Sequence, residues 1–361
     1  MPAESYDRAL LVVPRLRVQN ANAISSPMTW GFPSITSFVG LMHALERKLE
    51  ADCGLLFLGV GVVCHSFEAQ THRGYTHSFH LTRNPVAKDG STAGIVEEGR
   101  IHLDISLVFD VELRLDLIDE AARQQLADTV ADTLATLRVA GGSVIAPHRP
   151  PRRAPRPQLQ LVPEDQEQKQ EEYAKLSRRL LPGFALVARD DVLQSRLTTL
   201  RAASDKATDV TALDAWLDLS RLNYRAVRVP IEPATRTALD AQESDAGQNA
   251  AERIEWQRDE RAGWMVPIPV GYAALSDLHA AGSVTQARDA TTPLRFVESV
   301  YSIGQWVSPH RLRDASQLIW WPEHDAAKGL YRCVNACNPD TFKGASAAWA
   351  AEQIPAESLS D

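Results

Sequence analysis

The sequence lacks a long apolar run and lacks the features of a signal peptide. No stretch of about 18 or more consecutive apolar residues occurs among its 361 residues, so no transmembrane helix and no membrane partner are predicted. The first residues, MPAESYDRALLVV, are acidic and polar before a short apolar run, without the basic start and small-residue cleavage site of a secreted chain. We therefore expect a cytoplasmic protein.

Cysteine is scarce, which argues against a disulfide framework. Of the four cysteines, Cys53 and Cys64 lie in apolar stretches and are typical of small core residues. Cys333 and Cys337 form a C-x3-C pair, which is weak evidence for a metal or a disulfide because no second close pair accompanies it. We expect all four to be structural.

The chain also lacks an excess of positive charge. Its formal net charge of −8 excludes a protein that coats nucleic acid by bulk charge alone. A local basic groove remains possible, because the segment HRPPRRAPRP at 148–157 holds four arginines and no acidic residue.

The motifs of several enzyme classes are absent. There is no G-x-S-x-G, no Walker loop and no dinucleotide glycine fingerprint after a strand. The segment CHSFEAQTHRGYTHSFH holds Cys64, His65, His72, His77 and His80, but its spacings fit no standard zinc signature. We therefore predict no metal, no cofactor and no catalytic residue.

One enzymatic alternative stays open. Some ferredoxin-like RNA-binding proteins cleave RNA by using a histidine, tyrosine or lysine near their first helix as an acid or base. Here His43 lies inside an apolar helix, where packing is the more frequent role. The alternative function is a metal-independent endoribonuclease that processes RNA.

The first 148 residues contain six predicted segments, in the order β-α-β-β-α-β. This order predicts an α+β protein with a ferredoxin-like core of the RNA-recognition type, an antiparallel sheet with two helices on one face. Ser34 is a suitable N-cap for the first helix, and Gly141-Gly142 a suitable end for the second. The predicted strands span 8–19, 55–70, 101–113 and 143–147, and the predicted helices span 34–50 and 119–138.

Two further regions complete the expected organisation. Residues 71–100 form a long excursion between two strands, which we interpret as a hairpin-like projection. Residues 149–337 form an irregular α+β part, followed by a loose tail at 338–361. Within it we expect helices at 164–181, 191–203 and 209–224, and a strand at 184–190. We also expect aromatic packed structure at 263–272, 292–311 and 316–333, and an exposed polar loop at 233–260.

The loop RVQNANAISSPMTWGFPS, residues 17–34, carries more polar and aromatic side chains than a turn requires. Arg15 and Arg17 should share one face of the first strand, where they could contact phosphates, although an exposed strand face is the simpler explanation. Amides such as Asn20 can read base edges or merely shape a turn. Trp30 could stack on a base or staple the start of the helix, whose hydroxyls and amides suit a phosphate.

Six segments together resemble a known family: PRLRVQNANAISSPMTWGFPS, TRNPVAKDGSTAGIVEEGRIHL, RVAGGSVI, RRLLPGFALV, GWMVPIPVGY and TPLRFVESVYSIGQWVSPHR. They resemble the Csy-type, "Cas-five" family subunit of the type I-F CRISPR surveillance complex (Cascade), over roughly residues 8–335. That resemblance implies a prokaryotic protein of the repeat-associated RNA-binding (RAMP) superfamily that takes part in antiviral defence.

The resemblance also implies the partners. It implies a non-catalytic subunit that binds the 5′ handle of the CRISPR RNA (crRNA) and forms a heterodimer with the large subunit of the complex. The projection at 71–100 would be a thumb that contacts the adjacent backbone filament subunit, and the assembly would search target double-stranded DNA. Trp306, Trp320 and Trp321 are candidates for the large-subunit interface, with core packing as the stronger alternative for each.

The residues and the resemblance together give one predicted RNA-binding set. It comprises Arg15, Arg17, Gln19, Asn20, Asn22, Trp30, Ser34, Thr36, Ser37, Arg83, Arg100 and Arg149.

Overall fold

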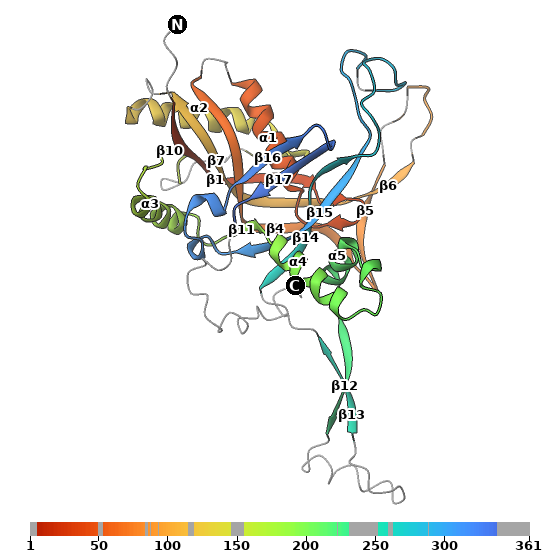
Figure 1. Ribbon diagram of the computed structural model, residues 1–361. Helices are drawn as coiled ribbons and strands as arrows, with labels where there is room; N and C mark the ends of the chain where they lie inside the picture. The colour runs from red at the N-terminus through yellow and green to blue at the C-terminus, as the bar shows by residue number, and fades with distance from the viewer. Residues whose placement is uncertain are drawn as a thin grey trace, which may run out of the picture.

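The computed structural model describes residues 6–49, 53–83, 86, 88–92, 94–114, 119–145, 155–221, 223–230, 252–258, 263–287 and 289–337 (Figure 1). It is a mixed α+β structure whose strands are mostly joined in one 13-stranded sheet. That sheet takes strands from both sides of residue 148, so the two parts expected from the sequence share one sheet. No helix within these ranges is long and apolar enough to cross a membrane.

Three long antiparallel strands form the centre of this sheet: β1 (Tyr6–Asn22), β7 (Arg100–Arg114) and β4 (Leu55–Arg73). With β9 (Gly142–Val144) they give the local strand order β4-β7-β1-β9, so all four predicted strands are confirmed. Two short strands extend the β1 side: β8 (Arg138–Val139) pairs with β9, and β10 (Gln158–Leu161) pairs with β1.

The two predicted helices of the first part are confirmed and cover one face of the central strands. α1 (Ile35–Lys48) buries Phe38, Met42 and Leu45, which recur at helical spacing. α2 (Glu120–Ala135) buries Val130 and Leu134, and Asp119 caps its start by accepting hydrogen bonds from two backbone amides. We call the face that these helices cover the first face.

The second face of the central strands is covered only in part. Val12, Val63 and Val108, from β1, β4 and β7, pack against the apolar side of α3 (Gln166–Arg179) and the segments around it. The half of each strand that these residues occupy is therefore buried on both faces, as its continuous apolar sequence requires. The rest, residues 15–22 of β1, 64–73 of β4 and 100–106 of β7, is the outer half.

The C-terminal strands close a circuit with β4. β11 pairs with both β4 and β15, and β16 pairs with both β4 and β17, so the pairing returns to its start through β14. Each strand of the circuit thus has two neighbours, although β16 meets β4 only where Trp320 lies opposite Val60. The strands are β11 (Phe184–Ala188), β14 (Trp264–Ala274), β15 (Val297–Val307), β16 (Trp320–Asp325) and β17 (Leu330–Asn335).

Smaller elements surround this sheet. β2 (Ile24–Ser26) and β3 (Thr29–Trp30) form a two-stranded unit in the loop before α1, and three single turns of 3-10 helix lie at Ala207–Asp209, Pro309–Arg311 and Ala315–Gln317. α4 (Asp190–Ala202) and α5 (Ala212–Ser220) pack on β15 through a small core that includes Leu197, Trp216 and Ile303. Hence the predicted helices at 164–181, 191–203 and 209–224 are confirmed, the last only over 212–220.

Two hairpins project from the sheet (Figure 1). β5 (His77–Arg83) pairs with β6 (Ile95–Glu98), which confirms a hairpin within 71–100. β12 (Tyr224–Pro230) pairs with β13 (Glu252–Arg258), so the prediction of a loop over all of 233–260 is wrong for 252–258. The sequence ERIEWQR alternates apolar and polar residues, and this period-two pattern specifies a strand despite its polar composition. The tail predicted at 338–361 lies outside the described residues.

Candidate nucleic-acid interface

The outer half of the sheet presents polar side chains on its second face. Leu16 and Val18 are buried on the first face, so Arg17 between them points to the other side and is exposed. Within the described part of the chain, no hydrogen bond or ion pair engages the guanidinium of Arg17. Arg17 is therefore a cation that is free to meet an anion from outside the chain.

Arg15 lies beside Arg17 but is partly neutralised. A bulge in β1 breaks the pairing with β7 between Val13 and Leu16, and Arg15 takes a left-handed backbone conformation there, with φ of 55°. Its guanidinium lies 3.1 Å from Asp104 Oδ2, and Asp104 is the residue opposite Arg17 in the register. Both arginines thus lie on the second face, with one carboxylate between them.

The two asparagines of the loop make different hydrogen bonds. Asn22 donates from its amide nitrogen to the Ile24 carbonyl at 2.8 Å and accepts from the Ile24 N–H at 3.0 Å. This closed pair uses the side chain of Asn22 to shape the turn. Asn20 sits in a second bulge, with φ of 57°, and its backbone N–H donates to His102 Nδ1 at 3.1 Å. The side chain of Asn20 is exposed.

The residues at the start of α1 are already paired within the chain. Ser34 accepts a hydrogen bond from the Thr36 N–H and donates to the Pro269 carbonyl, both at 3.3 Å. Ser37 donates its hydroxyl to the Ser34 carbonyl at 2.7 Å. Thr36 and Tyr272 bring their hydroxyls within 3.3 Å of each other. These contacts cap the helix and join it to β14, so a phosphate at this position would have to displace them.

Trp30 is the most exposed aromatic residue of the loop, at 55%. Its ring meets Phe79 of β5 edge to face, with the ring centroids 5.4 Å apart. The loop before α1 therefore contacts the base of the β5–β6 hairpin. Trp30 remains available for stacking on the side that Phe79 does not cover.

The structure thus places most of the predicted RNA-binding residues in two groups, while Asn20 lies apart in the second bulge of β1. Arg100 belongs with the first group, because it lies opposite Asn22 on the second face, where Glu98 pairs with it at 2.7 Å. Arg83 lies in β5, and Arg149 lies outside the described residues. The second-face group is Arg15, Arg17, Gln19, Asn22 and Arg100, and the group beside α1 is Trp30, Ser34, Thr36 and Ser37.

Sequence reasoning missed a histidine–serine pair at the boundary of this face. His65 Nε2 lies 2.7 Å from Ser106 Oγ, and His65 Nδ1 lies 2.5 Å from the Pro182 carbonyl oxygen. The Pro182 carbonyl can only accept, so Nδ1 carries a proton, and in the neutral ring Nε2 accepts from the Ser106 hydroxyl, whose oxygen also accepts the Arg15 N–H. Burial lowers the pKa of His65 from its ordinary value.

This pair has the partners of a base and a nucleophile but not the access that catalysis requires. Ser106 is 1% exposed, so no substrate can reach its oxygen. The pair instead joins β4, β7 and the turn before β11. No local motif signals it, because its two members are far apart in the sequence. His43, the histidine of the first helix, is half-buried and lies 3.9 Å from Glu46.

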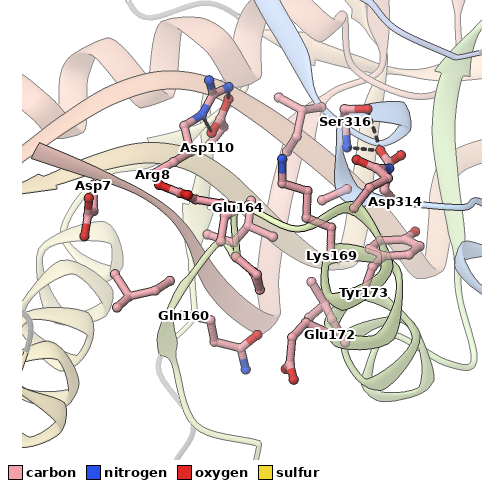
Figure 2. Close-up of a pocket in the computed structure, with 18 of the residues that line it drawn as sticks. Asp7, Arg8, Asp110, Gln160, Glu164, Lys169, Glu172, Tyr173, Asp314 and Ser316 are labelled. Atoms are coloured by element: carbon pink, nitrogen blue, oxygen red, sulfur yellow. Dashed lines mark hydrogen bonds and ion pairs between the residues drawn. The ribbon is translucent and has the colours of Figure 1, made fainter.

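A cavity of about 740 Å³ lies elsewhere, between α3, β1 and the 3-10 turn at 315–317 (Figure 2). Its charged lining is mainly acidic, with Asp7, Glu164, Glu172 and Asp314. The guanidinium of Arg8, which also lines it, is bound to the buried carboxylate of Asp110. A nucleic-acid backbone would be repelled here, and none of the predicted RNA-binding residues lines this cavity.

The predicted structural role of the cysteines agrees with their surroundings. All four are free, Cys64 and Cys333 are buried, and burial raises the pKa of each of these two thiols to about 12. Across the described ranges, no group of three or more His, Cys, Asp or Glu side chains is placed to hold a metal ion.

Comparison with known proteins identifies relatives over almost all of these elements. The family model for "CRISPR-associated protein (Cas_Csy2)" matches residues 11–333. The chain is 46% identical, over 327 residues, to the CRISPR-associated protein Csy2 of Pseudomonas aeruginosa (strain UCBPP-PA14). The aligned region covers 90% of this chain and 94% of that relative.

Proposed function

The chain belongs to the Cas_Csy2 family of CRISPR-associated proteins, and from this we propose that it is a non-catalytic subunit of a type I-F CRISPR surveillance complex. In this proposal it is the "Cas-five" subunit, and it holds the 5′ handle of the crRNA on the outer half of its central sheet. The observation that carries the proposal is a polar sheet face that the described residues leave exposed, with Arg17 on it, in a protein of this family.

The strand order supports a ferredoxin-like core of the RAMP type. The first four major strands follow the order second-third-first-fourth, all antiparallel, with both helices on one face. RNA-recognition folds use the face opposite the helices to hold single-stranded bases. Here α3 covers one half of that face, which leaves the outer half as the RNA surface.

The chemistry of this face suits a single strand held by a few local contacts. Arg17 supplies a positive charge for one phosphate, and Gln19 offers an amide beside it. Arg15 and Arg100 each share their charge with a carboxylate, so they contribute less attraction but hold a defined position. The net charge of −8 elsewhere discourages nonspecific RNA binding.

We assign each proposed protein partner to a different part of the fold. The β5–β6 hairpin would be the thumb that contacts the backbone filament subunit, and the C-terminal part would pair with the large subunit. Trp306 and Trp320 are poor anchors for that pairing, since they are 8% and 1% exposed and belong to the core. The complete assembly would then engage target double-stranded DNA.

Photocrosslinking tests the RNA surface directly. A CRISPR repeat RNA that carries 4-thiouridine in its handle should crosslink to peptides containing residues 15–22 or 100–106. Crosslinks confined to the large subunit, or to the acidic cavity, would contradict the proposal. The same labelled RNA tests the alternative function, because clean cleavage by the purified chain without partners would identify an endoribonuclease.

A further inference from the structure

The β12–β13 hairpin extends away from the rest of the protein as a narrow ribbon (Figure 1). Its two strands pair with each other over seven residues, and within the described residues neither pairs with any other strand. An isolated two-stranded ribbon is only marginally stable in water. A ribbon of this length is therefore expected to gain stability from a ligand or partner that lies along it.

One side of the ribbon combines aromatic rings with positive charge. The register places Tyr224 opposite Arg258, Ala226 opposite Trp256 and Arg228 opposite Ile254, so these six side chains share one face. Tyr224 is 55% exposed and Trp256 is 68% exposed. We call this set of six residues the ribbon face.

The charge of the ribbon is opposite to that of the whole chain. Residues 224–230 and 252–258 hold four arginines and two glutamates, a net charge of +2, whereas the whole chain carries −8. Exposed rings with arginines beside them suit an anionic ligand that also has flat surfaces. Single-stranded nucleic acid has both properties, because its bases stack on aromatic rings and its phosphates attract arginine.

Further exposed rings lie on β11, β14 and β4 of the central sheet. Trp264, at the start of β14, packs against Phe184 with the ring centroids 6.1 Å apart, and each side chain is 39% exposed. Phe184 lies opposite Cys64 of β4, and Phe67, three residues further along β4, is 48% exposed. Phe67 lies opposite Leu103, which is buried on the first face, so its ring is on the side of β4 away from the proposed RNA surface. The ribbon face is therefore separate from the second-face group.

We propose that the ribbon face is a second contact site for single-stranded RNA, with bases stacked on Tyr224 and Trp256 and a phosphate beside Arg258. The inference rests on the proposed function, which supplies RNA as the strand that this chain holds. The ribbon face has no Asn, Gln, Ser or Thr, unlike the loop at 17–34, so its binding should not depend on base sequence.

The test uses the full-length chain and two fluorescent RNAs, an oligouridine without any CRISPR sequence and a CRISPR repeat RNA. Fluorescence anisotropy measures the affinity of each RNA for the wild type and for the double variant Tyr224→Ala/Trp256→Ala. Removal of both rings should weaken oligouridine binding by about tenfold or more. The matched variant Tyr224→Phe/Trp256→Phe retains the rings and should stay within about twofold of wild type.

Phe296→Ala serves as a control for the loss of an exposed ring elsewhere, since Phe296 is 53% exposed in the segment before β15. It should leave binding unchanged. Circular dichroism of each variant verifies that the sheet is intact, which is expected because the ribbon face lies outside the core.

Several outcomes would overturn the inference. Equal oligouridine affinity of the wild type and the double alanine variant would remove the ribbon face from the RNA path. Oligothymidine serves as a third probe: if the double alanine variant bound it more weakly than the wild type but bound oligouridine equally well, the occupant would be single-stranded DNA. If the variant lost a copurifying subunit but kept its RNA affinity, the occupant would be a protein. If the wild type binds neither RNA, the proposed function itself fails, which is distinguishable because the failure precedes any substitution.

Discussion

His65 Nε2 accepts a hydrogen bond from the hydroxyl of Ser106 at 2.7 Å, which joins β4 to β7 where the covered and uncovered halves of the sheet meet. The same imidazole donates from Nδ1 to the Pro182 carbonyl before β11. A protonated ring could only donate to Ser106 Oγ, and its charge would be partly buried, so this junction favours a neutral His65. The central sheet and the C-terminal strands are thus coupled through one titratable group.

This coupling predicts a stability that falls in mild acid. Burial lowers the pKa of folded His65, so below about pH 6.5 the unfolded chain binds a proton that the folded chain does not. The contribution of His65 is therefore complete above pH 6.5 and is lost as the pH falls toward the lower folded pKa. Urea unfolding at pH 7.5 and 5.5 measures this loss of stability. The free energy of unfolding should change by less than about 1.4 kcal/mol per pH unit through this group.

His65→Gln provides the matched control for this pH dependence. A glutamine amide can accept from Ser106 and donate to Pro182, but it does not titrate. We expect the variant to lose less stability between the two pH values than the wild type loses. An equal loss in both proteins would show that other groups cause the acid sensitivity.

Asn22 is predicted to act on RNA binding through the shape of its loop. Asn22→Ala removes both hydrogen bonds to Ile24 and should weaken handle binding equally for RNAs that differ at any single base. Asn22→Asp keeps the acceptor and should have a smaller effect. The measurement is the affinity for a series of single-base variants of the handle, and loss of preference at only one position would instead assign Asn22 to base reading.

Trp320 is predicted to stabilise the closed strand circuit and to have no direct role in partner binding. Its side chain is 1% exposed, and its indole N–H donates to the Leu186 carbonyl of β11 at 2.8 Å. Trp320→Ala should lower the free energy of unfolding by about 3–5 kcal/mol. Trp320→Phe should lower it by about 1–3 kcal/mol, because it leaves the Leu186 carbonyl unpaired.

Trp256→Ala is the control for loss of an exposed tryptophan and should change stability by less than about 0.5 kcal/mol. Denaturant titration of the three variants gives the comparison. If Trp320→Ala kept full stability but lost a copurifying subunit, Trp320 would belong to an interface and the core assignment would be wrong.

The sequence predicted the first six elements because their order is that of a known fold and most of them carry a local hydrophobic pattern. The alternation in IHLDISLVFDVEL and the helical spacing of Phe38, Met42 and Leu45 are local signals that the fold preserves. The strand at 252–258 was missed because its polar composition outweighed a short alternation in the sequence reasoning. The pairing of β4 with β11 and β16 depends on contacts between distant residues, which no local pattern encodes.

The candidate site was predictable in residue type but not in arrangement. The excess of amides and hydroxyls in the loop at 17–34 is visible in the sequence, and the structure accounts for part of it within the chain. Asn22 shapes a turn, and Ser34 and Ser37 cap α1. Two bulges in β1 determine which of its side chains face outward. A bulge cannot be predicted reliably from the hydrophobic pattern of a strand.

The central claim is that RNA lies on the outer half of the second face, and the salt dependence of binding by Arg17→Ala tests it most directly. Affinity for the crRNA, measured across a salt series, should show a slope smaller by about 0.7 than that of the wild type, which corresponds to one lost phosphate contact on a single strand. Arg47→Ala, an equally exposed arginine at the end of α1, should leave the slope unchanged. An unchanged slope and affinity for Arg17→Ala would contradict the account.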